Sequence, residues 1–554
     1  MFSEFRKECE KICGSNSKYL EMPKNEIADL ALPCFHLAKA SGKSPIEIAR
    51  SLERDYKKKK KTLIGEIKAL GPYINFYINH AKFTKLIVEE MAEGLKYKKT
   101  GKKIMVEYSG PNSNKPLHIG HLRNDTIGMA VSNILEFVGN DVIRANIVND
   151  RGVHICKSMF AYKKWGKGEE PKKKGDHFVG DYYVMFEQKA KENDKIKEEV
   201  QEMLRKWEAG DKETVQLWIK MRKWTLDGFH KTYEKFGSKF DVWFFESDFY
   251  DKAKPIVDQG MKKGIFTENE KGDIIALLES YGLPNKTVLR GDGTSVYITN
   301  DLALTKHKIE KYKLSKCIWV VASEQKLNFQ QLFKIFELLG YSWHKDCHHL
   351  SYGLVNLPSG RMKSREGIVV DADDLIEEMS QIAKKEIESR EKEGKTEASK
   401  KQLEQRSLAI ALAAIKYFMI KTDPQKDMLF NPEEAISFEG DTGPYIQYTY
   451  ARARSILNKS GKKPLLGALT TKEMEIIKMI SKFNEIIDNA AEQLKPNHLA
   501  NYLHELSAKF NTYYHENKII GSKNEKELLS FVNAVAYVLK TGLELLGMQA
   551  LEKM

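Results

Sequence analysis

The sequence has few cysteines, and their spacing suggests neither a disulfide framework nor a zinc site. Six cysteines are scattered over 554 residues, with no Cys-x-x-Cys pair among them. Small secreted domains and zinc modules need closely and regularly spaced cysteines. We therefore exclude both classes, expect no protein metal site, and expect a reducing compartment.

Long apolar runs are also missing. The first ten residues, Met1 to Glu10, are charged and contain no apolar signal core. No stretch approaches the ~20 apolar residues that a membrane helix requires. The sequence therefore predicts a cytoplasmic protein without a membrane segment.

What the chain does have is length and an excess of positive charge. With 554 residues, it is long enough for three or more domains with large cores. Lys and Arg number 90 and Asp and Glu 77, which gives a net charge of +13. Such an excess suits a polyanionic partner, for which RNA is the obvious candidate, although many soluble proteins are mildly basic.

One stretch, Tyr108 to His121, is expected to organise the rest of the chain. Before it, the apolar segment Lys103 to Tyr108 predicts a buried strand. After it, apolar residues recur at helical spacing from Leu122 to Val138, and Asp141 to Val148 predicts a second strand. The stretch is therefore the strand-to-helix crossing of a parallel βαβ unit.

The residues of this crossing suit the binding of a phosphate chain. Ligands of open parallel sheets bind beyond the carboxyl ends of the strands, and helix N-termini favour phosphate. His118 and His121 share one face of the expected first helical turn, near which Pro116 also lies. Gly120 leaves room for a flat ring, and Lys115 adds a cation. Such a site can stabilise charge in phosphoryl or nucleotidyl chemistry; a helix start with two solvated histidines is the alternative.

These residues resemble a known family. His118 to His121 matches the HIGH signature of class I aminoacyl-tRNA synthetases, and the longer run Ser109 to Arg123 resembles its arginyl-tRNA synthetase version. The resemblance extends, with gaps, over nearly the whole chain. It implies a multidomain α/β protein with three parts: an N-terminal α+β appended domain (1–95), a catalytic domain with a Rossmann-type doubly wound parallel sheet and a helical insertion at about 161–240 (96–375), and a C-terminal all-α helical bundle (376–554).

A second signature of the same class follows later in the chain. The run Arg361 to Gly367 resembles the KMSKS motif in the loose form seen in arginyl-tRNA synthetases, with Ser364 in place of the second lysine. Many members of the family lack that lysine and use the one before HIGH, here Lys115, so which cation meets which phosphate stays open. By resemblance, the catalytic residues are Lys115, His118, His121, Lys363 and Arg365. The residues that bind ATP, which brings Mg²⁺ with it, are then Lys115, His118, Gly120, His121, Met362 and Lys363.

Recognition of arginine requires side chains that complement its guanidinium, which is planar, permanently charged and presents five donors. Paired carboxylates with a further acceptor provide it. Glu246 follows the apolar run Val242 to Phe245, and Tyr297 and Asp301 lie four apart. We expect Tyr297 and Asp301 at the junction where a strand (295–298) gives way to a helix (301–312). Core packing could explain Tyr297 alone, and helix capping could explain Asp301 alone.

The resemblance assigns a role to each of these residues. Glu246, Tyr297 and Asp301 correspond to residues that hold the arginine side chain. Asn112 and Gln325 correspond to residues that bind its α-amino and α-carboxylate groups, and His121 also lies near the amino acid.

Contacts with tRNA are expected in two places. Lys57 to Lys61 is a run of five lysines, which is most simply a solvated surface but could contact phosphates. The segment Gly71 to Ile78 resembles the family's N-terminal domain, which contacts the tRNA elbow. Tyrosines alternate with arginines in Ser437 to Arg454, which resembles the start of the anticodon-binding domain. The tRNA-binding candidates are Lys57, Lys58, Lys59, Tyr445, Tyr448, Arg452 and Arg454.

Hydrophobic periodicity predicts the remaining elements. Helices are expected at Glu26–Ser41, Pro45–Leu52, Asn193–Glu208, Glu213–Phe236, Asn328–Leu339, Asp373–Lys385, Lys400–Lys421, Thr471–Gln493, Asn497–Glu516 and Asn524–Leu546. Further strands are expected at Lys316–Val321 and His349–Asn356.

The resemblance thus implies ligation of L-arginine to tRNA(Arg) by a monomeric enzyme. The arginine carboxylate attacks the α-phosphate of ATP to give arginyl-adenylate and pyrophosphate, and a ribose hydroxyl of the tRNA then attacks the adenylate. Two alternatives are another class I synthetase, such as a cysteinyl or glutaminyl enzyme, and a non-catalytic tRNA-binding paralogue. The cysteinyl enzymes use a zinc site for which no Cys/His cluster is present here. A paralogue should have lost HIGH or the guanidinium acids.

Overall fold

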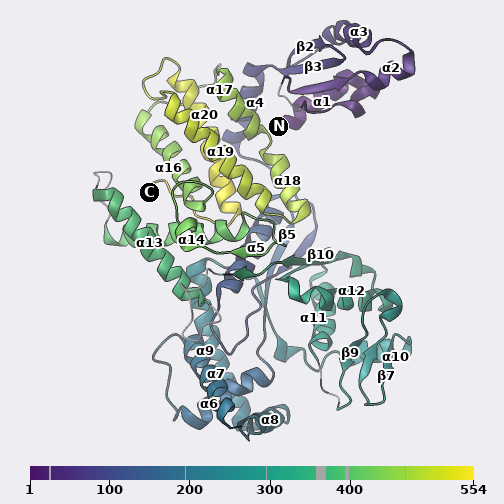
Figure 1. Ribbon diagram of the computed structural model, residues 1–554, viewed down its shortest axis with the longest axis vertical. Coiled ribbons are helices and arrows are strands. Elements are labelled where there is room, and N and C mark those ends of the chain that lie inside the picture. The colour runs from purple at the N-terminus through teal and green to yellow at the C-terminus, as the bar shows by residue number, and fades with distance from the viewer. Residues whose placement is uncertain are drawn as a thin grey trace.

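A five-stranded parallel sheet lies at the centre of the computed structural model (Figure 1). The structure describes residues 1–23, 27–193, 195–292, 294, 296–356, 370–392, 399–467 and 469–554. The strand order is β11-β10-β4-β5-β6, and every neighbouring pair is parallel. The strands are β4 (Lys103–Glu107), β5 (Asp141–Val148), β6 (Val242–Phe245), β10 (Lys316–Ala322) and β11 (Cys347–Tyr352).

The order of the strands confirms the prediction of a doubly wound sheet. The chain runs from β4 outwards to β5 and β6, and then returns to the other side of β4 to form β10 and β11. The strand order therefore reverses between β4 and β10, the place where ligands bind in sheets of this kind.

Helix α5 (Ile119–Phe137) makes the crossing from β4 to β5. It begins three residues earlier than predicted, because His118, not Ser or Thr, caps it. The helix is buried on nearly all sides, since the sheet covers one face and three helices of the C-terminal bundle cover others. These helices are α14 (Lys400–Ile420), α18 (Phe483–Gln493) and α20 (Glu525–Leu545). A Cβ atom at Gly128 would lie 2.3 Å from Cγ of Tyr108, so only glycine allows this helix to approach β4 so closely.

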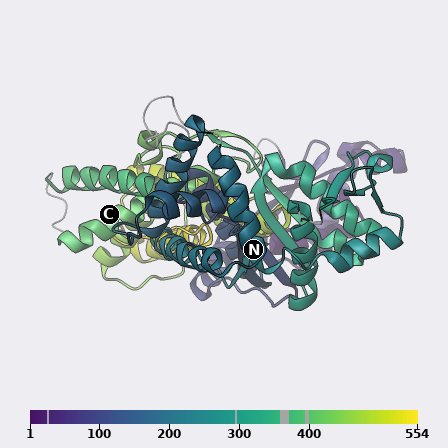
Figure 2. The same ribbon diagram turned by 90° about the horizontal axis from the view of Figure 1, so that it is seen from below.

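The insertion between β5 and β6 is helical, as predicted, and has its own apolar core. Trp207 is buried in that core, and Trp218 and Trp224 pack against it. Two of its helices, 153–165 and 175–192, were not predicted individually. In the second of them, the glycines Gly175 and Gly180 weaken the helical signal. The four helices are α6 (Val153–Trp165), α7 (Gly175–Glu192), α8 (Lys195–Glu208) and α9 (Lys212–Phe236). Both views place the insertion between α13 on one side and the β7–β9 unit on the other (Figure 2).

The second half of the catalytic fold contains a small antiparallel sheet that was not predicted. Its strands are β7 (Phe266–Glu268), β8 (Ile274–Ala276) and β9 (Lys286–Leu289), and the helices around it are α10 (Lys254–Lys262), α11 (Tyr297–Tyr312) and α12 (Lys326–Leu339). The predicted strand at 295–298 is wrong, since Tyr297 and Ile298 begin α11; residue 295 lies outside the described residues. The Thr299 hydroxyl accepts the backbone N–H of Val296 at 2.8 Å and closes the first turn, which overrides the strand propensity of this segment. The predicted strand 349–356 is divided into β11 and β12 (Val355–Asn356), and β12 pairs with β13 (Met428–Leu429).

The N-terminal unit is an α+β domain, as predicted, but one of its helices is shorter than expected. Leu30 to Pro33 forms strand β1, which pairs with β3, so the predicted helix Glu26–Ser41 is wrong in this part. Short apolar runs do not distinguish strand from helix, and pairing with β3 decides here. The elements are α1 (Phe2–Cys13), β1 (Leu30–Pro33), α2 (Phe35–Ser41), α3 (Pro45–Lys57), β2 (Ile64–Leu70), β3 (Tyr73–Ile78) and α4 (His80–Glu93).

The C-terminal part is all helical among the described residues, apart from the short strand β13, and packs on α5. The predicted helix Thr471–Gln493 is divided at Lys482 into two. The helices are α13 (Ala372–Lys392), α14 (Lys400–Ile420), α15 (Pro432–Ala435), α16 (Gly443–Ser460), α17 (Thr471–Ser481), α18 (Phe483–Gln493), α19 (Asn497–Glu516) and α20 (Glu525–Leu545).

Helix α20 differs from the expectation that no segment could span a membrane. By length and composition, the 21 residues of this helix are long and apolar enough to cross a membrane. However, 72% of its apolar window is buried inside the protein, which is the pattern of a core helix. All six cysteines are free thiols in the structure.

Candidate active site

The loop that follows β4 is held in place by two buried amides. The backbone N–H of Ser109 donates to Oδ1 of Asn124 at 2.7 Å, and that of Gly110 donates to Oδ1 of Asn146 at 3.2 Å. Ser109 has a φ of +77°, an unfavourable value for a residue with a side chain. Non-glycine residues in this conformation cluster at functional sites, where neighbouring contacts hold them. The sequence did not identify Asn124 or Asn146.

The two histidines of the HIGH segment form the N-terminal cap of α5. Nδ1 of His118 accepts the backbone N–H of Gly120 at 3.1 Å, and Nδ1 of His121 accepts that of His118 at 3.1 Å. Their ring centroids are 3.9 Å apart. A Cβ atom at Gly120 would lie 3.0 Å from His118 Cε1, so the flat ring beside this glycine is that of His118.

Both imidazoles are neutral and can donate a hydrogen bond. Burial lowers the pKa of His118 to about 4 and the pKa of His121 well below its usual value, and nearby Lys115 lowers both further. Because Nδ1 of each ring is an acceptor, the proton of each neutral ring is on Nε2. Half-buried Lys115, whose pKa is also lowered by burial, adds a cation. The start of α5 therefore offers two N–H donors, one ammonium and a helix N-terminus to a phosphate chain.

The segment that follows the KMSKS-like run is bonded directly to the HIGH segment. The backbone N–H of Ile119 donates to the carbonyl of Val370 at 2.9 Å, and that of Ala372 donates to Leu117 at 3.0 Å. The described chain that resumes at Val370, after the KMSKS-like run, is thus adjacent in space to the HIGH segment. Arg361, Met362, Lys363 and Arg365 themselves lie outside the described residues.

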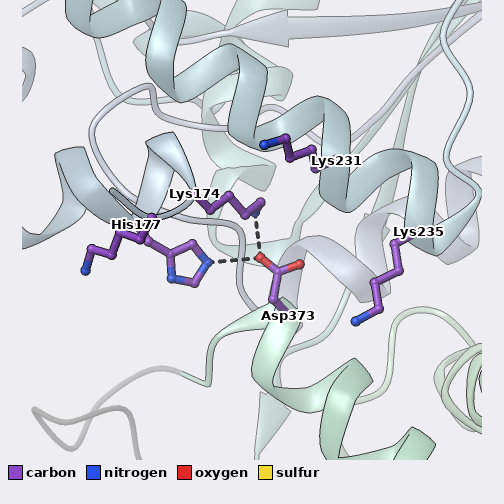
Figure 3. Close-up of a pocket in the computed structure, with 6 residues that line it drawn as sticks. Lys174, His177, Lys231, Lys235 and Asp373 are labelled. Carbon is purple, nitrogen blue, oxygen red and sulfur yellow. Dashed lines mark hydrogen bonds and ion pairs between the residues drawn. The ribbon is translucent and has the colours of Figure 1, made fainter. Parts of the chain in front are cut away.

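Asp373, two residues further on, is bonded to the insertion (Figure 3). Its Oδ2 lies 2.5 Å from Nζ of Lys174 and 3.0 Å from Nε2 of His177, and Oδ1 accepts from Thr232 at 3.1 Å. Asp176, His177 and Asp373 are close enough to share a metal ion, but Nζ of Lys174 already bonds both carboxylates. We therefore describe this group as an ion-pair cluster, the Asp373 cluster, that joins α7 and α9 to the start of α13.

Two of the three predicted arginine-binding side chains come together. Glu246, at the carboxyl end of β6, is 9% exposed, and Asn300 Nδ2 donates to its Oε1 at 2.9 Å. Asp301 follows Asn300 on α11, and Asn328 Nδ2 donates to its Oδ2 at 3.4 Å. Oε2 of Glu246 is buried and has no hydrogen-bond partner among the described residues.

The electrostatics of these two acids suit a cationic ligand. Burial, together with the nearby Asp301 carboxylate, raises the pKa of Glu246 to about 7. Burial also raises the pKa of Asp301 to about 6. Two neighbouring carboxylates that are costly to ionise are stabilised by a cation that hydrogen-bonds to both.

The other predicted ligands of arginine are less enclosed. Tyr297 begins α11, and its side chain is 71% exposed. Asn112 is exposed in the loop after β4, where it forms a bridge with Asn149 after β5. Gln325 is exposed just after β10. Asn112, Glu246 and Gln325 therefore follow three strands of one parallel sheet, at the edge where their carboxyl ends lie.

Asp150 is a buried residue of the site that the sequence analysis missed. Its carboxylate accepts from the backbone N–H of Ser247 at 2.9 Å, from the Ser247 hydroxyl at 2.8 Å and from Arg222 at 2.7 Å. It thereby fixes the residue next to Glu246 and ties β6 to the insertion. The polar run Asn149 to Arg151 directly after a strand was the available signal.

The predicted tRNA-binding residues lie in two separate units and are partly engaged. In the N-terminal unit, Lys57 pairs with Glu53 at 2.6 Å, Lys59 donates to the carbonyl of Ile12 at 2.7 Å, and Lys58 is exposed. In the bundle, the Arg452 guanidinium lies 4.8 Å from the Tyr448 ring and 5.1 Å from the Tyr514 ring. Arg454 pairs with Glu552 at 3.2 Å, and Tyr445 is half-buried.

Comparison with known families matches almost the whole chain. Residues 3–78 match the model of the arginyl tRNA synthetase N terminal domain. Residues 82–432 match tRNA synthetases class I (R), catalytic domain, and residues 446–554 match the DALR anticodon binding domain.

Curated relatives and solved structures agree with these matches. The arginine–tRNA ligase of Parabacteroides distasonis is 40% identical over 97% of this chain and 95% of its own. That of Treponema denticola is 42% identical over 93% and 90%. The structure of Thermus thermophilus arginyl-tRNA synthetase superposes with a TM-score of 0.83 at 28% identity, covering 99% of this chain and 100% of that one. Mycobacterium tuberculosis methionyl-tRNA synthetase, at 10% identity and a TM-score of 0.51 over 81% and 91% of the two chains, shares the fold alone.

Proposed function

The chain belongs to the arginyl-tRNA synthetase family and is an arginine–tRNA ligase, and on that premise we propose that Glu246 and Asp301 hold the guanidinium of L-arginine. The observation that carries this proposal is the buried, unpartnered Oε2 of Glu246 beside the half-buried Asp301. A guanidinium presents five N–H donors in one plane and can bond two carboxylates at once. A lysine ammonium is a compact point charge and cannot fill this geometry, so the pair would select arginine.

The remaining contacts with arginine are proposed from their position at the sheet edge. Asn112 and Gln325 follow β4 and β10, the two strands that flank the switch point. We assign them to the α-amino and α-carboxylate groups, with His121 close to the reacting carboxylate. Tyr297 would have to turn inward from its exposed position to cover the guanidinium.

ATP is a substrate of this class I chemistry. We propose that Nε2–H of His118 and of His121, Lys115 and the N-terminus of α5 bind its phosphates, with Gly120 beside His118. Arg361, Met362, Lys363 and Arg365 would complete the site from the KMSKS-like run. Mg²⁺ would bind together with ATP, because Glu246 and Asp301 would already be bonded to arginine. The ion would help to balance the charge of the phosphates. The protein supplies no nucleophile, so its contribution is positioning and charge stabilisation.

Several further assignments are proposals of the same kind. The tRNA would contact Lys57, Lys58 and Lys59 in the N-terminal unit and Tyr445, Tyr448, Arg452 and Arg454 in the bundle. The domain boundaries would fall near residues 95 and 375, with the insertion at about 161–240. The enzyme would be monomeric and cytoplasmic, and the burial of α20 supports the absence of a membrane segment.

Amino-acid-dependent pyrophosphate exchange, with and without tRNA, tests the assignment of the acidic pair. Asp301→Asn and Glu246→Gln should each raise the KM for arginine about 100-fold. Each change removes a charge-assisted hydrogen bond and leaves the guanidinium buried without one of its two carboxylates. The KM for ATP should stay within about twofold of that of the unmodified enzyme. Glu310→Gln, an exposed change on the same helix, is the control. An unchanged arginine KM in both site variants would refute the assignment.

A further inference from the structure

A buried ion pair lies behind the proposed guanidinium site. Lys308 of α11 is 1% exposed, and its ammonium bonds to Oε2 of Glu107, the last residue of β4, which is 6% exposed. Buried charges of this kind are costly to desolvate and are retained where they contribute more than stability. The established activity assigns no role to this pair.

Lys308 is placed to act on Asp301. The two residues are seven positions apart on α11, two helical turns, and therefore lie on one face of the helix. The Lys308 ammonium lowers the pKa of Asp301, whereas Glu107 raises it by a smaller amount. The charge of Lys308 therefore affects the Asp301 carboxylate more strongly than the charge of Glu107 does.

The surroundings fix Lys308 in this position. Its Nζ lies 5.1 Å from the centroid of Phe244 on β6 and 5.7 Å from that of Trp319 on β10, and both rings belong to the apolar cluster on this face of the sheet. Trp319 is also the register partner of Glu107 between β10 and β4. The ammonium therefore contacts three strands of the parallel sheet, and it cannot move into solvent without disrupting them.

Among the described residues near this pair, Glu107 is the group that compensates the charge of Lys308. The thiols of Cys317 and Cys347, on β10 and β11, have pKa values raised by burial and are neutral. His307, the preceding residue, has a pKa lowered by burial and is neutral as well. Around Asp301, the remaining charged groups are Lys286 of β9 and Glu246 after β6.

We infer that Lys308, anchored by Glu107, is a positioning residue for amino-acid recognition that keeps the Asp301 carboxylate ionised and ready for the guanidinium. It does not bind the substrate itself, since it is buried and carries the same charge as arginine. This inference rests on the proposed role of Asp301. It predicts that arginine affinity depends on pH in a way that Lys308 controls.

The test compares the arginine KM of Lys308→Met with that of the unmodified enzyme across pH in the pyrophosphate exchange assay. Loss of the ammonium lets Asp301 take up a proton at higher pH, so the arginine KM should rise about tenfold near pH 6.5 and stay within about twofold near pH 8.5. The KM for ATP should not change at either pH. Lys311→Met, an exposed change on the same helix, is the matched control and should behave like the unmodified enzyme.

Two further variants keep the test decisive if Lys308→Met folds poorly. Lys308→Arg retains the charge and should retain the pH profile. Glu107→Gln combined with Lys308→Met removes both charges and should shift the profile in the same direction by a smaller amount. Thermal melting identifies the variants that are folded. A rise in the arginine KM that is equal at both pH values, or no rise, in folded charge-removing variants would overturn the inference.

The Asp301→Asn variant distinguishes a failure of the inference about Lys308 from a failure of the proposed role of Asp301 in binding arginine. If Asp301→Asn leaves the arginine KM unchanged, the role of Asp301 fails and the inference about Lys308 loses its premise. If Asp301→Asn raises the KM but the charge-removing variants of Lys308 do not, only the inference about Lys308 fails.

Discussion

At the scale of single residues, the site depends on which groups are charged before substrate arrives. The histidines of the HIGH segment are neutral because they are buried and lie beside Lys115. Their Nδ1 atoms accept backbone amides, so in the proposed role each ring would act as an oriented N–H donor through Nε2. Their contribution to charge stabilisation therefore needs no proton uptake, which would cost free energy at neutral pH.

His121→Ala should lower kcat for arginine activation by about 10²-fold to 10³-fold, the usual cost of removing one oriented donor to a developing charge. In the unmodified enzyme, no histidine titration near pH 6.5 should appear in the kcat profile. Pyrophosphate exchange measures both quantities, and His515→Ala, an exposed change on α19, is the control. Activity close to that of the unmodified enzyme in a folded His121→Ala variant would contradict the role of His121.

At the scale of elements, the insertion is attached to the HIGH segment through a short stretch of chain. Residues 370–372 bond to Leu117 and Ile119, and the next residue, Asp373, bonds to α7 and α9. Helix α7 also touches the HIGH approach directly, since a Cβ atom at Gly180 would lie 2.9 Å from Cδ of Pro116. The insertion and the first turn of α5 are therefore joined directly to each other.

Asp373→Asn should weaken this unit in a pH-dependent manner. Hydrogen bonds from His177 and Lys174 outweigh burial and lower the pKa of Asp373, so its stabilisation is present above the ordinary carboxyl pKa and is lost as pH falls through the folded-state value. The hydrogen bond to Asp373 raises the pKa of His177, so that contribution is complete below about pH 6.5 and is lost as pH rises through the folded-state value.

The loss in the free energy of unfolding should therefore be about 1–3 kcal/mol near pH 6 and smaller near pH 9. Denaturant unfolding of Asp373→Asn measures it at the two pH values. Asp374→Asn, an exposed change at the next position, is the control. Equal losses at both pH values would show that His177 does not contribute.

The sequence predicted elements well where a regular pattern was long, and poorly where tertiary contacts decided. Strand β5 has the predicted bounds, and α5 differs by three residues at its start, because strong periodicity leaves little choice. Leu30 to Pro33 became a strand only because β3 pairs with it. Lys174 and Asp373 are in contact although they are 199 positions apart, and the sequence around either residue does not predict this contact. Glu246 and Asp301 were predicted from family resemblance, and their role stays a prediction, whereas Asp150 and Lys308 were identified only from their contacts.

At the scale of the whole molecule, the last residues of the chain connect the bundle to the catalytic fold. Lys416 of α14 donates to the carbonyl of Gly547 at 2.7 Å, and Gln447 of α16 donates to that of Gln549 at 2.7 Å. Asn133 of α5, the helix that begins at HIGH, donates to the carbonyl of Leu545 at 3.3 Å. The tail thus lies where the two largest parts of the protein meet.

Deletion of residues 549–554 should destabilise the protein measurably. It removes the nearer of two carbonyl acceptors of buried Gln447 and the buried side chain of Leu551, for a combined loss of about 2–4 kcal/mol. Differential scanning calorimetry should show a lower midpoint of unfolding. Deletion of residues 553–554 alone, which leaves both contacts in place, is the control. An equal midpoint for the two deletions would show that the tail is not a structural connection.

The central claim, that two carboxylates with raised pKa values receive the guanidinium of arginine, is tested most directly by the protons released on arginine binding. Titration calorimetry of the intact enzyme in buffers of different ionisation enthalpy measures that number. With pKa values of about 7 for Glu246 and about 6 for Asp301, binding should release about one proton near pH 6.5 and almost none near pH 9. Binding that releases no proton at either pH, with the same affinity at both, would contradict the account.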